Sequence, residues 1–479
     1  MFHRAIIVVF LVIALPGIAQ AFSCPHLPAQ TERAMKGWWV PGLAIGIVDR
    51  GKTVFRRGFG VSDTVSMAPV SAKTLFGIGS VSKSMTALSF AVSHVQKELS
   101  LDTPINIVLP YFPDGITLKH LLSHTAGWPR HDALWYLNAY DRHELPRRLA
   151  LLPKFSRPGR SFQYNNVPFS AVGEFLTEFA GIPWDDWVRS TVLSPAGMTD
   201  AITDVSVLRN IPERATGYYP SADGRLTIPL RDTNPVVPAG GIYAHLDDML
   251  RYVGLLAEHG AVAGTQVIPA AAVSLLWQPN SAGYGLGMRT GSWRGEKLAF
   301  HPGAIDGYAA RISILPDRLA GVIVLSNLSG ITRVAQIVSQ IALDCLVGAP
   351  ITDWTSRLGE RRPAAAKKPD PPAAVVVDRP RTAYAGVYRH PAYGTFQISV
   401  AVGLQTLAGD FHGRNIVLDY AGKDSWRLRE TEWPLREGLI FRFLELDDGK
   451  FQSFATPLAD GPTYRHNAGP MVFKRVDLP

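Results

Sequence analysis

Ser80 and Lys83 are the residues whose types and spacing most directly indicate chemistry in this 479-residue chain. They stand three residues apart at the start of a segment with helical apolar spacing, so both side chains fall on one face. A serine hydroxyl becomes a good nucleophile when a neighbouring base takes its proton, and burial makes lysine such a base by disfavouring its charged form. No other lysine has a serine three residues before it. The pair predicts a serine nucleophile with a lysine base, although a capped amphipathic helix would also explain this spacing alone.

Tyr164 and Asn166 form a second pair, in the pattern Tyr-x-Asn. A phenol beside an ammonium group loses its proton more readily and can pass it to a leaving group. An asparagine amide can orient both a lysine and a substrate carbonyl. Tyr136 begins the same pattern, but it lies in an aromatic, apolar run that is typical of packing. Tyr164 follows a Pro-Gly turn, and functional residues concentrate on loops, so we favour Tyr164.

The third segment is Phe300-His301-Pro302-Gly303-Ala304, just before a predicted hairpin. Because proline donates no backbone hydrogen bond, this segment is expected at a sheet edge. Such an edge could bind substrate backbone as an added strand. The amide of Ala304, with that of Ser80, could hold an oxyanion. By itself, His301 could equally be a turn histidine.

Several common catalytic motifs are absent. The sequence has no Gly-x-Ser-x-Gly, no His-Glu-x-x-His or comparable metal pair, and no phosphate-binding Gly-x-x-x-x-Gly-Lys-Ser/Thr. These absences argue against an α/β-hydrolase, a zinc hydrolase and a nucleotide-binding protein.

The composition, with 47% hydrophobic and 18% charged residues, is that of an ordered globular protein. The net charge of +8 raises the question of nucleic acid, but the basic residues are scattered. Their densest group, between residues 361 and 368, lies in an Ala/Pro-rich stretch typical of a solvated linker. We therefore predict no nucleic-acid partner.

Residues 1–21 have the pattern of a signal peptide. A basic start precedes an apolar run from Ala5 to Leu15, a Pro-Gly break and Ala19-Gln20-Ala21. The run is shorter than the roughly 20 residues that a bilayer requires, and no later run reaches that length. We expect cleavage after Ala21 and a periplasmic or secreted mature chain without a transmembrane segment. In an oxidising compartment Cys24 and Cys345 could pair, or they could be two buried thiols.

The elements that must position the three motifs lie in residues 22–350. Leu43–Val48 and Thr53–Phe59 flank a polar turn and predict a hairpin, and Ala309–Leu315 with Gly321–Leu325 predict another. Between them, Ser80 to Val95 has helical periodicity. This arrangement predicts an α+β domain whose terminal strands share one antiparallel sheet.

Residues 351–381 are rich in Pro, Ala and charge and are predicted to be a linker. Residues 382–479 then predict a small β-barrel or sandwich, because short strands alternate with Gly and Asp turns. The predicted strands are Thr395–Val400, Ile416–Tyr420, Trp426–Arg429, Leu439–Leu446, Gln452–Ala455 and Met471–Val476.

Taken in order, the three motifs resemble those of serine hydrolases related to class C β-lactamases and penicillin-binding D,D-peptidases. Esterases of β-lactamase fold and D-aminopeptidases belong to the same superfamily. The resemblance covers about residues 30–345 and is carried also by Leu99-Ser100-Leu101-Asp102, residues 116–127, Pro195-Ala196-Gly197-Met198 and Pro238-Ala239-Gly240-Gly241. The segments at residues 384–388 and 390–394 are similar to the lipocalin-like barrel appended to some members.

This resemblance implies that Ser80 is acylated and that Lys83 and Tyr164 transfer protons. Asn166 would anchor substrate and lysine, and His301, Gly303 and Ala304 would belong to the substrate-binding edge. It also implies that no metal or organic cofactor is used. His124 lies in a matching Leu-Leu-Ser-His-Thr-x-Gly stretch, and we interpret it as structural.

The third motif departs from the Lys-Thr-Gly of typical β-lactamases of this fold, because His301 and Pro302 replace the cation and the hydroxyl. Histidine carries only part of a charge near neutral pH, which weakens the expectation of β-lactam carboxylate recognition. The sequence therefore favours a peptidase or esterase acting on an ester, an amide or a D-amino-acid peptide. A β-lactamase proper, and a sensing protein that is acylated without turnover, remain the alternatives.

Overall fold

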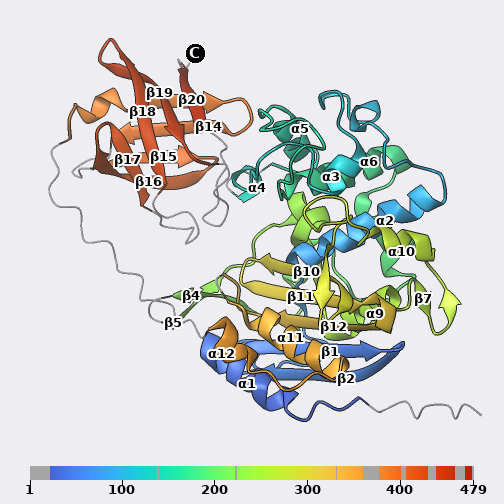
Figure 1. The fold of residues 1–479 in the computed structure, drawn as a ribbon. Helices are drawn as coiled ribbons and strands as arrows, with labels where there is room; N and C mark the ends of the chain where they lie inside the picture. The colour runs from blue at the N-terminus through green and yellow to red at the C-terminus, as the bar shows by residue number, and fades with distance from the viewer. Residues whose placement is uncertain are drawn as a thin grey trace, which may run out of the picture.

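A six-stranded antiparallel sheet organises the first part of the chain (Figure 1). The computed structural model describes residues 22–136, 140–221, 224–330, 332–359, 377–400, 406–429, 439–458 and 470–476. The strand order is β2-β1-β12-β11-β10-β9. The bounds are β1 (Gly42–Asp49), β2 (Lys52–Gly60), β9 (Arg289–Trp293), β10 (Glu296–Ile305), β11 (Tyr308–Leu315) and β12 (Ala320–Ser326). Both predicted hairpins are confirmed, and β1 pairs with β12, so strands from the two ends of the domain share one sheet.

Helices cover both faces of this sheet. Leu43, Ile45 and Ile47 of β1 pack in one core cluster with helix α11 (Val334–Leu346) and helix α1 (Leu27–Trp38). Ala44 and Val48 point the other way, into a cluster that contains helix α9 (Leu246–Ala257). Because both faces are buried, β1 is a continuous apolar strand and does not alternate with polar residues.

The other helices of this domain form a second region, and α2, α3, α5 and α6 lie together above the sheet in Figure 1. The α-helices are α2 (Ser82–Val95), α3 (Leu118–Leu122), α4 (Ala133–Tyr136), α5 (Glu144–Ala150), α6 (Val167–Ala180), α7 (Trp184–Val188), α8 (Val205–Leu208) and α10 (Ala270–Leu275). Three small strand pairs join them: β3 (Phe76–Gly77) with β6 (Tyr243–Ala244), β4 (Gly217–Ser221) with β5 (Gly224–Ile228), and β7 (Ala261–Val262) with β8 (Thr265–Gln266).

The strand that carries the third motif is an edge strand along only part of its length. β9 pairs with β10 from Glu296 to Phe300 and then ends. From His301 to Ile305, β10 is paired with β11 on one side, while β9 does not extend along the other. Pro302 therefore stands just beyond the last pair with β9, where a missing backbone donor breaks no ladder between the two strands.

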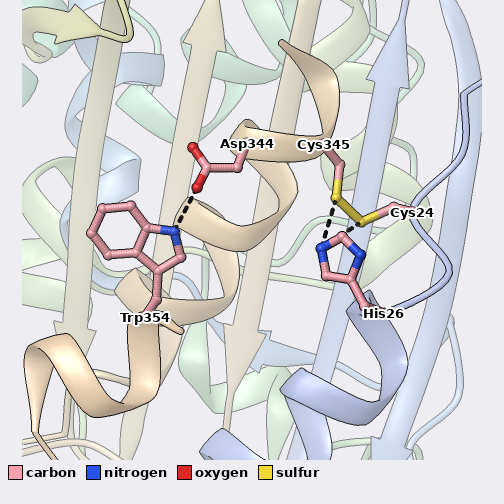
Figure 2. Close-up of a disulfide and its surroundings, with 5 residues drawn as sticks. All are labelled: Cys24, His26, Asp344, Cys345 and Trp354. Carbon is pink, nitrogen blue, oxygen red and sulfur yellow. Dashed lines mark hydrogen bonds between the residues drawn. A yellow bond between two sulfur atoms is a disulfide. The ribbon is translucent and has the colours of Figure 1, made fainter. Parts of the chain in front are cut away.

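A disulfide joins Cys24, just before α1, to Cys345 in the last turn of α11 (Figure 2). The two Cα atoms are 5.6 Å apart. The ring of His26 lies beside both sulfur atoms, with Nε2 3.6 Å from that of Cys345. This answers the question that the sequence left open, because the two cysteines are paired and link segments 321 residues apart.

The predicted linker contains one ordered element. Helix α12 (Trp354–Leu358) packs against α1 and α11. Trp354 donates its indole N–H to the carboxylate of Asp344 at 2.8 Å (Figure 2), and Arg294 donates to the same carboxylate. Residues 351–359 therefore continue the first domain, while residues 360–376 lie outside the described part of the chain.

The C-terminal part is a closed, eight-stranded antiparallel barrel in which strands adjacent in sequence are adjacent in space (Figure 1). The strands are β13 (Gly386–His390), β14 (Gly394–Val400), β15 (Thr406–Phe411), β16 (Arg414–Gly422), β17 (Ser425–Arg429), β18 (Ile440–Asp447), β19 (Lys450–Thr456) and β20 (Met471–Val476). Pairing of β13 with β20 closes it. Packed aromatic side chains fill its interior, with the rings of Phe396 and Phe411 stacked at 3.8 Å.

The barrel confirms the all-β expectation and adds two strands, β13 and β15, to the six predicted ones. β15 includes Gly409 and Asp410, which are depleted in strands and common in turns. β13 is only five residues long. Ring closure stabilises both strands, since each then has two neighbours.

The predicted signal peptide, residues 1–21, lies outside the described residues. Within the described ranges, none of the helices combines the length and the apolar character needed to span a bilayer.

The disulfide should contribute to stability. Replacing both Cys24 and Cys345 by Ser is expected to lower the free energy of unfolding by about 2–4 kcal/mol, because the unfolded chain loses a long-range cross-link. Guanidinium unfolding with and without a reductant measures this. Reductant should destabilise the wild type and leave the double variant unchanged, whereas equal stability of the two proteins without reductant would contradict the expectation.

Candidate active site

Ser80 lies in η1 (Gly79–Val81), a short 3-10 helix of one turn that leads directly into α2. Two hydroxyls fix this turn: Ser82 donates to the carbonyl of Gly79 at 2.8 Å, and Ser84 donates to that of Val81 at 2.7 Å. The start of α2 therefore lies where the sequence placed it. The helix N-terminus provides a positive partial charge beside the Ser80 oxygen.

Lys83 is completely buried, one turn after Ser80. Its Nζ lies 3.1 Å from Ser80 Oγ, 2.7 Å from Asn166 Oδ1 and 2.6 Å from the carbonyl oxygen of Ala239. Burial lowers the pKa of Lys83 well below its usual value. The guanidinium of Arg130 lowers this pKa further, and the carboxylate of Asp132 opposes that effect.

An ammonium would donate one N–H group to each of these three oxygens, but the lowered pKa of Lys83 favours the neutral amine. Such an amine has two N–H groups and one lone pair, whereas an ammonium has three N–H groups and no acceptor. The oxygens of Asn166 and Ala239 can only accept, so they take the two N–H groups. The lone pair is then left for Ser80, whose hydroxyl can donate to it. The geometry thus prepares Lys83 to take the hydroxyl proton.

Asn166 is held at the N-cap of α6 by a carboxylate that faces its other end. Its Nδ2 donates to Asp132 Oδ1 at 2.9 Å, which directs its Oδ1 to Lys83. Asp132 is itself bound by Arg130 at 2.5 Å and by the indole N–H of Trp135 at 3.1 Å. Asn166 was predicted from the sequence, but Asp132 was not, because a single carboxylate in a loop carries no recognisable pattern.

Tyr164 lies beside the same lysine. Lys83 Nζ is 5.0 Å from the centre of its ring, and Arg130 lies 5.5 Å from it. The ring of His124 is 4.4 Å away. His124 is buried, and its Nδ1 accepts from the backbone N–H of Asn165 at 3.3 Å, so it packs directly behind the Tyr-x-Asn segment.

Tyr136, the other tyrosine that begins a Tyr-x-Asn pattern, has a different partner. Its hydroxyl donates to the carboxylate of Asp306, and Arg231 lies 4.4 Å over its ring. The structure therefore brings Tyr164 to Lys83 and gives Tyr136 a separate polar contact.

Gly79 and Gly303 allow β10 to approach the nucleophile. A Cβ on Gly79, where φ is +53°, would lie 2.3 Å from the amide nitrogen of Ala304. A Cβ on Gly303 would lie 2.0 Å from the carbonyl oxygen of Ile78 and 3.3 Å from the amide nitrogen of Ser80. Only glycine fits at both positions. This approach brings the segments that carry the amides of Ser80 and Ala304 together, as a shared oxyanion site requires.

His301 is buried and neutral. Burial lowers its pKa well below the usual histidine value. Its Nδ1 lies 2.7 Å from the carbonyl oxygen of Pro302, which can only accept, so Nδ1 carries the hydrogen. Its Nε2 then accepts from the hydroxyl of Tyr284 at 3.1 Å. His301 therefore offers no positive charge to a substrate carboxylate.

Arg289, the first residue of β9, provides a positive charge that sequence analysis missed. Its guanidinium carbon lies 5.8 Å from the ring centre of Tyr284, 5.9 Å from that of Phe162 and 6.0 Å from that of Tyr164. Within the described ranges, no carboxylate forms an ion pair with it. In the sequence, the one feature that could have indicated Arg289 is its position shortly before the His301 motif.

Metal-ligating groups come together elsewhere. In the described part of the chain, three clusters have ligating atoms within 4.8 Å of one another: Cys24, His26 and Cys345; His143, Glu174 and Glu178; and Asp200, His245 and Asp248. None contains a predicted site residue. The first includes the disulfide, and Lys73 already forms an ion pair with Asp200 in the third.

Several known proteins are similar to this chain. The family model described as Beta-lactamase matches residues 29–343. Among curated proteins, the Unguisins hydrolase ungD' of Aspergillus campestris is 24% identical over 76% of this chain and 75% of its own length. Penicillin-binding protein 4* of Bacillus subtilis is 25% identical over 63% of this chain and 71% of its own. A D-aminopeptidase of Cereibacter sphaeroides is 27% identical over 60% of this chain and 57% of its own.

A solved structure shares the fold of both parts. The octameric penicillin-binding protein homologue from Pyrococcus abyssi matches with a TM-score of 0.62 and 20% identity, over 94% of this chain and 99% of its own. The family match covers well over half of the 479 residues and includes the six-stranded sheet with most of its helices. This chain therefore belongs to the Beta-lactamase family, whose relatives include penicillin-binding proteins and hydrolases.

Proposed function

We propose that this protein is an exported serine hydrolase that cleaves an amide or ester bond through an acyl-enzyme on Ser80. The observation that carries the proposal is the completely buried Lys83, whose Nζ lies 3.1 Å from Ser80 Oγ and whose pKa is lowered well below its usual value by burial. A nucleophile paired with a neutral base is the requirement for acyl transfer at serine.

In the first step Lys83 Nζ takes the hydroxyl proton while Ser80 Oγ bonds to the substrate carbonyl carbon. The carbonyl oxygen becomes an oxyanion, which the amides of Ser80 and Ala304 stabilise. As the tetrahedral intermediate collapses, the bond from carbon to the leaving nitrogen or oxygen breaks. Lys83 passes its proton to Tyr164, and Tyr164 protonates the leaving group. Water then attacks the acyl carbon and gives a proton to the same pair. The bond from the acyl carbon to Ser80 Oγ breaks, Lys83 returns the proton to Oγ, and the acid leaves.

The surroundings of β10 favour a peptide-like substrate with a negative charge. The outer edge of residues 301–305, which β9 does not cover, can pair with an extended backbone. His301 is neutral, but Arg289 provides a half-buried guanidinium near Tyr164. A guanidinium binds a carboxylate through two parallel hydrogen bonds. We propose an amide or ester substrate, such as a D-amino-acid peptide, with a carboxylate that contacts Arg289.

Export is part of the proposal. Disulfides persist in oxidising compartments outside the cytoplasm, and Cys24 and Cys345 are paired. Cleavage after Ala21 would make Cys24 the third residue of the mature chain. This supports a periplasmic or secreted enzyme.

Ser80→Ala tests the nucleophile. Hydrolysis of a p-nitrophenyl ester should fall by roughly a thousandfold or more, because no other residue can form the acyl-enzyme. Intact-mass spectrometry after incubation with benzylpenicillin gives a second readout, in which any adduct should be absent from the variant. Near-normal turnover by Ser80→Ala would overturn the proposal. Acylation of the wild type without product release would instead favour the sensing protein.

The pH dependence tests the base. Lys83 must be neutral to accept a proton, and its lowered pKa keeps it neutral at lower pH than an ordinary lysine. We therefore expect kcat/KM to fall as pH drops through the Lys83 pKa and to become level at a pH well below the pKa of an ordinary lysine. With an ordinary lysine, kcat/KM would instead rise about tenfold per pH unit up to about pH 10. Such a continued rise would contradict the assignment.

Arg289→Gln tests the specificity. For an ester substrate with a free carboxylate, KM should rise about tenfold, as expected for loss of one charge-assisted contact, while kcat stays nearly unchanged. The same substrate with its carboxylate methylated is the control, and it should bind both proteins alike. Arg289→Lys should recover part of the affinity. An equal effect on both substrates would show that Arg289 has only a structural role.

A further inference from the structure

We propose that Tyr393 of the C-terminal barrel is a positioning residue for the catalytic centre. It would act on the loop Pro129–Asp132, which holds Asn166 and, through Asn166, Lys83. The inference rests on the proposed function, since it concerns the same proton-transfer site. It assigns to the barrel a role in catalysis that goes beyond supporting the fold.

The barrel reaches the first domain through the turn between β13 and β14. The hydroxyl of Tyr393, in this turn, lies 2.9 Å from His131 Nδ1, and both side chains are completely buried. Burial lowers the pKa of His131 to about 3, so its ring is neutral. Its Nε2 is buried and has no hydrogen-bond partner among the described residues. The Tyr393 hydroxyl is therefore the side-chain contact that fixes this ring.

Two further contacts hold the same turn in place. Arg148 of α5 donates to the carbonyl of Pro391 at 2.6 Å. The ring of His412, between β15 and β16, lies 5.5 Å from that of Tyr140, and its Nε2 lies 3.0 Å from the carbonyl oxygen of Tyr393. The turn is thus attached to the first domain at Arg148 and Tyr140 as well as at His131, which gives Tyr393 a fixed position from which to act.

The loop that Tyr393 contacts is bonded directly to the Tyr-x-Asn segment. The side chain of Asn165 donates to the carbonyl of Pro129 at 2.6 Å, and that of Asn166 donates to Asp132 at 2.9 Å. His131 lies between these two anchor points in the chain. A shift of this loop would move Asp132 and with it the amide that faces Lys83 Nζ at 2.7 Å.

Small displacements of Asn166 should change the rate of the proton transfer from Ser80 to Lys83. Proton transfer from Ser80 requires the Lys83 lone pair to face the hydroxyl, and that orientation depends on where Asn166 Oδ1 lies. A displacement of about 1 Å in a positioned catalytic group can cost up to about a hundredfold in rate. A residue that positions the loop should therefore affect kcat more than KM.

The test is Tyr393→Phe in the full mature chain, with hydrolysis of a p-nitrophenyl ester as the readout. The variant keeps the ring and removes only the hydroxyl. We expect kcat to fall roughly tenfold with KM changed by less than about twofold, because substrate contacts are untouched. The acid limb of the pH profile should also move, since the surroundings of Lys83 change.

Tyr384→Phe is the matched control. Tyr384 is an equally buried tyrosine of the barrel, and its hydroxyl donates to Asp424 at 2.6 Å, within the barrel itself. This change should lower the melting temperature without lowering kcat. If Tyr393→Phe behaves in the same way, with a lower melting temperature and normal kcat, the positioning role is wrong.

A double-mutant cycle tests the route. Asp132→Ala removes the carboxylate through which the loop holds Asn166, so adding Tyr393→Phe to it should change kcat by less than about twofold. An equal fold-loss in both backgrounds would overturn the route through Asp132.

Ser80→Ala separates the two proposals. If Ser80→Ala retains activity, both the proposed function and the coupling are wrong. If Ser80→Ala is inactive but Tyr393→Phe has a normal kcat, only the coupling is wrong.

Discussion

The buried amine of Lys83 is the interaction on which the rest of the site depends. Burying a charged lysine away from water costs much free energy, and burying the neutral amine costs less. The neutral form must still place its two N–H groups, and the structure provides the Asn166 amide and the Ala239 carbonyl for them. The Asn166 amide is held by the carboxylate of Asp132, and the Ala239 carbonyl belongs to the helical turn η5 (Val237–Gly241). The Ser80 hydroxyl is then the remaining partner.

The second constraint is the close approach of two backbones. The start of α2 and the motif end of β10 meet where Gly79 and Gly303 leave no room for a side chain. This contact joins the helical region, which carries Ser80 and Lys83, to the sheet, which carries Ala304. The free edge of β10 follows from the same arrangement, because the pairing with β9 stops at Phe300, opposite Arg289. A nucleophile, its base and a strand edge are thereby brought to one place.

Much of this could be predicted from sequence, and the exceptions have physical reasons. The β1–β2 and β11–β12 hairpins were evident because polar turns separate strong apolar runs. Strand β15 was missed because Gly409 and Asp410 disfavour strands, and barrel closure stabilises it nonetheless. Ser80 and Lys83 were found because a single helical turn sets their distance. Asp132, Arg289 and the Ala239 carbonyl were missed because each comes from a separate loop or strand, which only the tertiary fold brings to the site.

The most direct test of this account is the titration of Lys83 itself, by ¹³C NMR of protein labelled at lysine Cε, with Lys83→Arg to assign its signal. If Lys83 is the base, its signal should titrate at a pH far below that of the other lysines and keep the position of a neutral amine above that pH. Titration of Lys83 together with the exposed lysines, near pH 10.4, would contradict it, because the residue would then be charged and unable to activate Ser80.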